Sequence, residues 1–211
     1  MNWKSNDRLV LIGDSITENG RLQDTESIGQ GYVRLVHDYL LTRHPSLKLD
    51  ICNQGIGGDR VSDLTERWEE DVLELKPDWL SISIGINDVW RQLDRPEIEQ
   101  VYPETFEEMY ENLLLQTKKH TNAQLILMEP TIIHESPVSE GNKLLQPYVK
   151  TVQHLAEKYD ALLVPAHQAF LDYLNAETGT ALTTDGVHMN TKGDMLMAST
   201  WLESVYQHSK V

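Results

Sequence analysis

Two segments near opposite ends of the chain hold side chains that could act together on an acyl group. Ser15 follows a short apolar run, and Asp185 and His188 stand three residues apart near the C-terminus. A carboxylate at that spacing can hold the imidazole Nδ1–H, which leaves Nε2 free to take a proton from a hydroxyl. Taken singly, the serine is equally typical of a helix cap or a turn. The pair is equally typical of an Asx turn beside a surface histidine, or of two metal ligands.

Two loops between these segments could present N–H groups to a developing negative charge. Glycines crowd the stretch 55–58, and Asn87 follows a later apolar run. Glycine lets a backbone N–H approach a ligand closely, and a carboxamide can donate in the same way. A dinucleotide fingerprint does not fit, because Arg60 stands where its third glycine would be. A flexible turn and a helix cap are the alternatives. Together the four segments supply every role that acyl transfer needs.

Short apolar runs bounded by glycine and proline alternate with amphipathic stretches, which predicts strands separated by helices. The predicted strands cover 9–12, 47–52, 79–84, 125–128 and 161–164. The predicted helices contain 32–40, 64–75, 106–114, 144–159 and 195–206. This alternation predicts a single α/β domain over residues 1–211, with a parallel sheet covered on both faces.

Open sheets of this kind bind ligands at the carboxyl ends of their strands, where the candidate residues lie. The segments 88–103 and 131–141 follow the third and fourth predicted strands and are long. We expect them to be connections that act as lids or substrate walls. Trp90, in the first of them, is predicted either to wall the acyl or alcohol pocket or to be a packing aromatic.

The charge of the chain argues against polyanionic partners. Eighteen Lys and Arg stand against 33 Asp and Glu, which gives a net charge of −15. Such a chain repels phosphate backbones and anionic headgroups, so we expect neither nucleic acid nor a membrane as a partner. We expect a small-molecule substrate, and a homo-oligomer stays open. Without cysteine pairs or an H-E-x-x-H motif, we expect no metal and no cofactor.

Targeting signals are also missing from the sequence. The N-terminus lacks a basic stretch followed by a long apolar one, and no apolar run approaches the length of a membrane span. The single cysteine, Cys52, rules out an intrachain disulfide. We expect a cytoplasmic protein.

The order of these motifs resembles that of the SGNH hydrolases, also called GDSL esterases or lipases. The matching blocks are Gly13-Asp14-Ser15-Ile16, Gly58 within its glycine turn, Gly85-Ile86-Asn87-Asp88 and Asp185-Gly186-Val187-His188. The four blocks stand in the family's order and span the chain.

The resemblance implies a flavodoxin-like three-layer α/β/α sandwich around a five-stranded parallel sheet, and a serine esterase. By position, Ser15 would be the nucleophile, His188 the base and Asp185 its orienting acid. The oxyanion hole would comprise the N–H groups of Ser15 and Gly58 and the side chain of Asn87. We also expect Asp14 and Trp90 at substrate-binding positions.

A narrower resemblance is to bacterial acetylxylan esterases of this family, which act on xylo-oligosaccharides inside the cell. It depends on Arg67-Trp68-Glu69-Glu70-Asp71, Lys76-Pro77-Asp78-Trp79 and Asn87-Asp88-Val89-Trp90-Arg91. The chain departs from the common patterns at Ile16, Thr184 and Met189, where Leu, Trp and Pro are expected. Because an acidic chain with few methionines does not suit an interfacial lipase, we expect short-chain acetyl esters as substrates, with acetylated sugars among them.

Other functions remain as alternatives. An acylhydrolase of the same fold could be a lipase, a lysophospholipase or a thioesterase. An α/β-hydrolase would need a G-x-S-x-G motif, which the sequence lacks. Glu18 and Glu129 also follow strands, as the two carboxylates of a glycosidase could. Five tryptophans make a non-catalytic carbohydrate-binding module conceivable.

Overall fold

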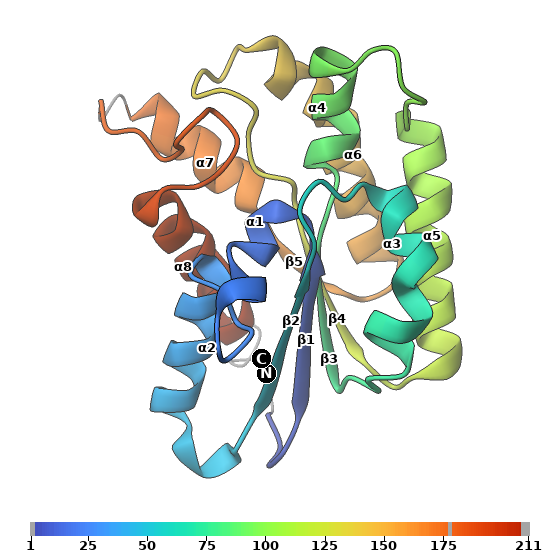
Figure 1. Cartoon of the computed structure of the whole chain (residues 1–211), viewed down its shortest axis with the longest axis vertical. Coiled ribbons are helices and arrows are strands. Elements are labelled where there is room, and N and C mark those ends of the chain that lie inside the picture. Colours follow the sequence, from blue (N-terminus) through green and yellow to red (C-terminus); the bar gives the residue numbers. More distant parts are fainter. Residues whose placement is uncertain (1–2, 177–178, 208–211) are drawn as a thin grey trace.

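The computed structural model describes residues 3–176 and 179–207, in which five parallel strands form one sheet (Figure 1). The strand order is β2-β1-β3-β4-β5. Their bounds are Arg8–Gly13 for β1, Asp50–Gly55 for β2, Trp79–Ser83 for β3, Gln124–Met128 for β4 and Leu162–Val164 for β5.

Helices cover both faces of the sheet, which makes the three-layer α/β/α sandwich. On one face lie α1 (Ser15–Glu18), α2 (Tyr32–Arg43), α7 (Ala166–Asn175) and α8 (Thr191–Gln207). On the other lie α3 (Val61–Trp68), α4 (Ile86–Asp94), α5 (Pro103–His120) and α6 (Glu140–Lys158). A wider helical turn at Glu69–Leu73 continues α3, and short 3₁₀ turns occupy Arg21–Gln23 and Pro45–Leu47.

The core lies between the sheet and these two layers. Residues 9–12 of β1 are wholly buried, as expected of a central strand covered on both faces. Two large aromatics fill the layers, and each satisfies its indole N–H. Trp201 of α8 donates to Ser81 Oγ at 3.0 Å, and Trp68 of α3 donates to Thr117 Oγ1 at 3.2 Å.

The direction of sheet winding reverses between β1 and β3. The chain leaves β1 for β2 on one side and then returns past β1 to β3, so the direction of winding reverses between these strands. Ligand sites of open parallel sheets lie at such a reversal. The segments after β1 and β3 begin with α1 and α4, which places Ser15 and Asn87 at this edge, at the upper end of the sheet in Figure 1.

Three parts of the structure differ from the sequence prediction. The second strand is Asp50–Gly55 rather than 47–52, and Leu47 ends a 3₁₀ turn. The segment 88–103 is not a long loop, because α4 runs to Asp94. The helix α7 was not predicted.

The segment 131–141 is a connection as predicted only up to Ser139, because α6 begins at Glu140. Its first three residues, Thr131, Ile132 and Ile133, are buried. Among the helices of the described residues, none has the length and apolarity to cross a membrane.

Candidate active site

A serine, a histidine and an aspartate from the two ends of the chain meet at the upper edge of the sheet. Ser15 Oγ lies 2.9 Å from His188 Nε2, and His188 Nδ1 lies 2.6 Å from Asp185 Oδ2. A carboxylate can only accept, so Nδ1 carries the imidazole proton and Nε2 accepts from the serine hydroxyl. This is the hydrogen-bond order of a nucleophile, a general base and an orienting acid.

The turn between β1 and α1 fixes the serine. Ser15 is the first residue of α1, and the Asp14 carboxylate caps that helix by accepting from Ile16 N–H at 2.9 Å. Asp14 is only 3% exposed, so its side chain is buried in the structure and does not lie on the surface that a substrate would meet. Burial raises the pKa of Asp14 to about 7, against the opposing effects of Ile16 N–H and His188.

A tight turn holds the aspartate and the histidine together. Asp185 Oδ1 accepts from the N–H groups of Val187 and His188 at 3.0 and 2.8 Å. Partial burial alone would raise the pKa of Asp185, but the bond to His188 and the two N–H groups outweigh it and lower that pKa. Asp185 therefore stays a carboxylate through the neutral range.

The segment 131–141 supports this turn from outside. Glu135 Oε1 accepts from Leu182 N–H at 2.9 Å, from Thr183 N–H at 2.6 Å and from Thr183 Oγ1 at 2.5 Å. His134 N–H donates to Gly186 O at 2.7 Å. One surface segment thus fixes the backbone on both sides of Asp185. These residues were missed in the sequence because side chain-to-backbone bonds across 47 residues leave no local pattern.

The glycine turn lies between the serine and Asn87. A Cβ built on Gly57 would stand 3.9 Å from Ser15 Cβ, and Asn87 Nδ2 donates to Asp59 O at 3.0 Å. Gly58 between them has φ +88°, a left-handed conformation that favours glycine. Within the described part of the chain, the N–H groups of Ser15 and Gly58 have no hydrogen-bond partner.

The electrostatics of this turn depend on Arg67 and Asp88, which the sequence motifs contain but to which they assigned no role. Arg67 of α3 donates to Gly13 O and Gln54 O at the ends of β1 and β2, and to the Asp59 carboxylate. Asp88 accepts from Val61 N–H at the start of α3. One guanidinium and one carboxyl thereby hold the turn at both of its ends.

Burial also governs Asp88, which is fully buried. It raises the pKa of Asp88 to about 7, opposed by Val61 N–H and by Arg60. Asp14 and Asp88 are therefore two buried carboxyls that both titrate close to neutrality beneath the site.

Trp90 lies beside the base. It belongs to α4, and its ring centroid stands 5.7 Å from that of His188 in an edge-to-face contact. Trp90 thus contacts the base, and its role as a wall of the acyl or alcohol pocket stays a prediction.

Two other kinds of site were alternatives in the sequence, a metal site and a pair of glycosidase carboxylates. No group of three or more metal-ligating side chains occurs in the residues that the structure describes. Glu129 is buried and holds Gln153 Nε2 and Gln168 N–H, so its carboxylate does not face solvent as a glycosidase acid would.

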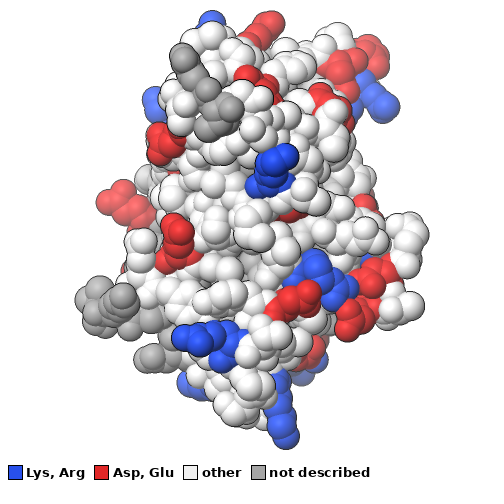
Figure 2. Space-filling view, turned by 90° about the vertical axis from the view of Figure 1, so that its left-hand side faces the viewer, with Lys and Arg blue, Asp and Glu red and all other residues white. Residues whose placement is uncertain are grey.

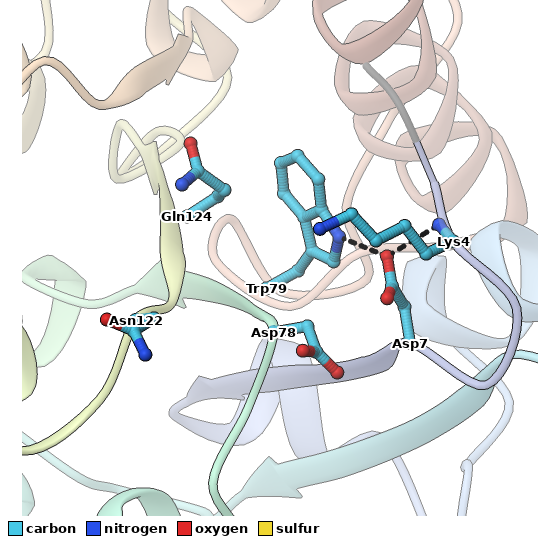
Figure 3. Close-up of a pocket in the computed structure, with 6 residues that line it drawn as sticks. All are labelled: Lys4, Asp7, Asp78, Trp79, Asn122 and Gln124. Atoms are coloured by element: carbon cyan, nitrogen blue, oxygen red, sulfur yellow. Dashed lines mark hydrogen bonds between the residues drawn. The ribbon is translucent and has the colours of Figure 1, made fainter.

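A cavity of about 550 Å³ opens at the opposite end of the sheet, where β1, β3 and β4 begin (Figure 3). Its lining includes Trp79, whose indole N–H donates to the Asp7 carboxylate. It contains none of the triad residues and is separate from the candidate site.

This fold, with the triad at the carboxyl edge of its sheet, defines a carboxylic ester hydrolase of the SGNH class. The model of the GDSL-like lipase/acylhydrolase family matches residues 11–196. The chain belongs to that family.

Individual relatives agree with this. An acetylxylan esterase from Geobacillus stearothermophilus is 38% identical over 208 residues, which cover 95% of this chain and 94% of that protein. A crystal structure of that enzyme matches with a TM-score of 0.90 at 37% identity, covering 97% of this chain and 96% of the other. An enzyme from the metagenome of Lake Arreo, Spain, described as an alpha/beta hydrolase, matches with a TM-score of 0.89 at 34% identity over 96% of both chains.

Proposed function

We propose that the protein is a serine esterase that removes acetyl groups from acetylated xylo-oligosaccharides through an acyl-enzyme on Ser15. The observation that carries the proposal is the 2.9 Å separation of Ser15 Oγ and His188 Nε2, with Asp185 on the other ring nitrogen. We further propose that residues 1–211 act as one hydrolase domain.

Acylation begins when Ser15 Oγ attacks the ester carbonyl carbon and His188 Nε2 takes the hydroxyl proton. The carbonyl π electrons move to oxygen and form a tetrahedral oxyanion. The imidazolium is stabilised by Asp185, whose lowered pKa keeps it ionised. Collapse of the intermediate breaks the bond to the sugar oxygen, which takes the proton from His188 Nε2 and leaves as the alcohol.

The oxyanion is stabilised by N–H groups that make no other hydrogen bond within the described residues. The N–H groups of Ser15 and Gly58 are without partners in the described chain, and the Asn87 amide uses one of its two N–H groups on Asp59 O. Donors already in place need no reorganisation as charge develops, which is why such sites stabilise the transition state strongly.

Deacylation repeats the same steps with water. His188 takes a proton from water, the hydroxide attacks the acyl carbon, and the bond to Ser15 Oγ breaks as the proton returns to that oxygen. Acetate leaves, and the enzyme is restored.

A small, water-soluble ester suits the molecule better than a lipid surface. The net charge is −15, and on the face that carries α2 and α8 the basic side chains are scattered among acidic ones (Figure 2). An acidic surface is repelled by anionic headgroups. The acetyl group and the xylose-based alcohol come from the Geobacillus relative, which is named an acetylxylan esterase. Several solved structures of that relative are catalytic mutants in which a serine, an aspartate or a histidine is replaced by alanine.

The cytoplasmic location and a homo-oligomer stay predictions. So does independence from nucleic acid and membranes.

Two rate series test the proposed substrate. In 4-nitrophenyl esters from acetyl to octanoyl, kcat/KM should be highest for acetyl, and Ser15→Ala should remove the activity toward every ester. Acetylated xylo-oligosaccharides should release acetate with a kcat/KM above that of an acetylated monosaccharide. A maximum at octanoyl would indicate a lipase or lysophospholipase instead. Binding of xylo-oligosaccharides without any ester hydrolysis would indicate a carbohydrate-binding module.

A further inference from the structure

Arg91 stands behind the Asn87 carboxamide and has no role in the scheme above. It lies four residues after Asn87 on α4, so the two side chains share one face of that helix. One terminal nitrogen of the guanidinium donates to Asn87 Oδ1 at 3.2 Å, and the other pairs with Asp94.

Three contacts keep this guanidinium in place. Besides Asn87 and Asp94, the indole of Trp90 lies under it, with Cζ 4.7 Å from the ring centroid. The Arg91 side chain is 16% exposed, compared with 34% for Asp94. A side chain held on three sides and largely shielded from water has little rotamer freedom left to lose when a substrate binds.

The contacts at both ends of the amide settle its orientation. Asp59 O can only accept, so it must face Nδ2, and Arg91 can only donate, so it must face Oδ1. In a flipped amide, Asn87 Oδ1 would face Asp59 O, which is also an acceptor, and Asn87 Nδ2 would face the Arg91 guanidinium, which is also a donor. With one N–H on Asp59 O, the second N–H is left for the oxyanion.

Arg91 also alters the strength of that second donor. A positive donor on a carboxamide oxygen draws electron density from its nitrogen, and hydrogen bonds in such a chain reinforce one another. The donor chain runs from Arg91 through the amide of Asn87 to the oxyanion.

We propose that Arg91 is a positioning residue that orients and polarises the Asn87 carboxamide as an oxyanion donor. It acts through Asn87 and does not touch substrate. The proposal rests on the proposed esterase function, because it assigns Asn87 to the oxyanion hole.

A double-mutant cycle on 4-nitrophenyl acetate tests it. Arg91→Met keeps an aliphatic chain over Trp90 but removes the donor, and should lower kcat about tenfold with KM changed by less than about twofold. Arg91→Lys keeps a charged donor, and should restore kcat to within about threefold of the unchanged enzyme. In an Asn87→Ala background, Arg91→Met should cause less than about a twofold further loss, because its target is gone.

Arg95→Met is the matched control. It makes the same substitution at an exposed arginine that directly follows α4, so kcat should stay within about twofold. Thermal unfolding of each variant separates lost activity from lost fold. An equal loss in Arg95→Met and Arg91→Met, or losses that multiply in the Asn87→Ala background, would overturn the role of Arg91. An unchanged kcat in Asn87→Ala alone would instead overturn the oxyanion assignment on which the proposal rests.

Discussion

Ser15 Oγ and His188 Nε2 lie 2.9 Å apart although 173 residues separate them in the chain. The serine is fixed from below by the start of α1, and the histidine by the Asp185 turn. Neither side chain is held by the other alone. The contact therefore depends on the backbone that carries each residue. We expect substitutions of residues that hold these two backbone segments to weaken the contact.

Removing Glu135 should loosen the turn that holds the base. Glu135→Ala leaves the N–H groups of Leu182 and Thr183 without their acceptor, and should cost about 1 to 3 kcal/mol in the free energy of unfolding. We expect kcat to fall about tenfold as His188 loses its fixed position. Urea unfolding and steady-state kinetics measure both. Glu140→Ala, an exposed change at the start of α6, is the control, and identical behaviour of the two variants would contradict the support role.

At Gly58 there is room for an added methyl group, but the backbone conformation is unfavourable for any residue with a Cβ. No atom lies within 4 Å of a Cβ built on it, so the cost of Gly58→Ala comes from its φ of +88°, about 1 kcal/mol. We expect kcat also to fall, because relaxing φ turns the N–H away from the oxyanion.

Gly179 provides a matched control for that change. Its φ is +68° with equally open space around it, and it lies outside the glycine turn. Gly179→Ala should lose similar stability with kcat unchanged. If Gly58→Ala kept full activity at the same stability loss, the Gly58 N–H would not be an oxyanion donor.

Asp88 should make stability fall as pH rises. Its pKa is about 7 when folded against an ordinary value of 3.8, so the folded state holds a proton that the unfolded state has lost. The contribution of protonated Asp88 to the free energy of unfolding is fully present below about pH 4 and is lost as the pH rises to about 7. Asp88→Asn cannot ionise, and between pH 5 and pH 8 its free energy of unfolding should gain about 2.5 kcal/mol relative to the unchanged protein.

Urea unfolding at those two pH values measures the gain. The comparison is made within each variant, so any constant cost of the substitution cancels. A difference that does not change between the two pH values would show that Asp88 is ionised throughout.

Asn87→Ala should remove a transition-state contact. If the carboxamide donates to the oxyanion, kcat should fall by about 10²–10³ with little change in KM. Saturation kinetics on 4-nitrophenyl acetate separate kcat from KM. A loss smaller than about fivefold in a folded variant would exclude Asn87 from the oxyanion hole.

The parts of the site that could be predicted from the sequence carry their chemistry in adjacent residues. Asp185 and His188 form a local turn, and Ser15 directly follows a buried strand. Each was only a candidate by itself, and the four blocks taken together assigned their roles. Arg91 and Glu135 could not be predicted, because their roles lie in bonds to a carboxamide and to a distant backbone.

The errors in the fold have physical reasons. The second strand was placed too early because Asn53 and Gln54 are polar, yet Asn53 Nδ2 donates to Thr17 O and Ile28 O and is satisfied inside the fold. The helix α4 was missed because the segment 88–103 was predicted to be a long connection, although a helix cap was an alternative for Asn87. Asn87 and Asp88 are buried near the start of α4 by contacts to α3 and the turn before it.

The most direct measurement is active-site labelling with a serine-directed organophosphonate, read by peptide mass spectrometry. We expect one equivalent of label per chain, all of it on Ser15, with activity lost in proportion to labelling. The variant Ser15→Ala should take up no label, and its kcat should be lower by about 10⁴ or more. Label on another residue, or hydrolysis that persists in Ser15→Ala, would contradict it.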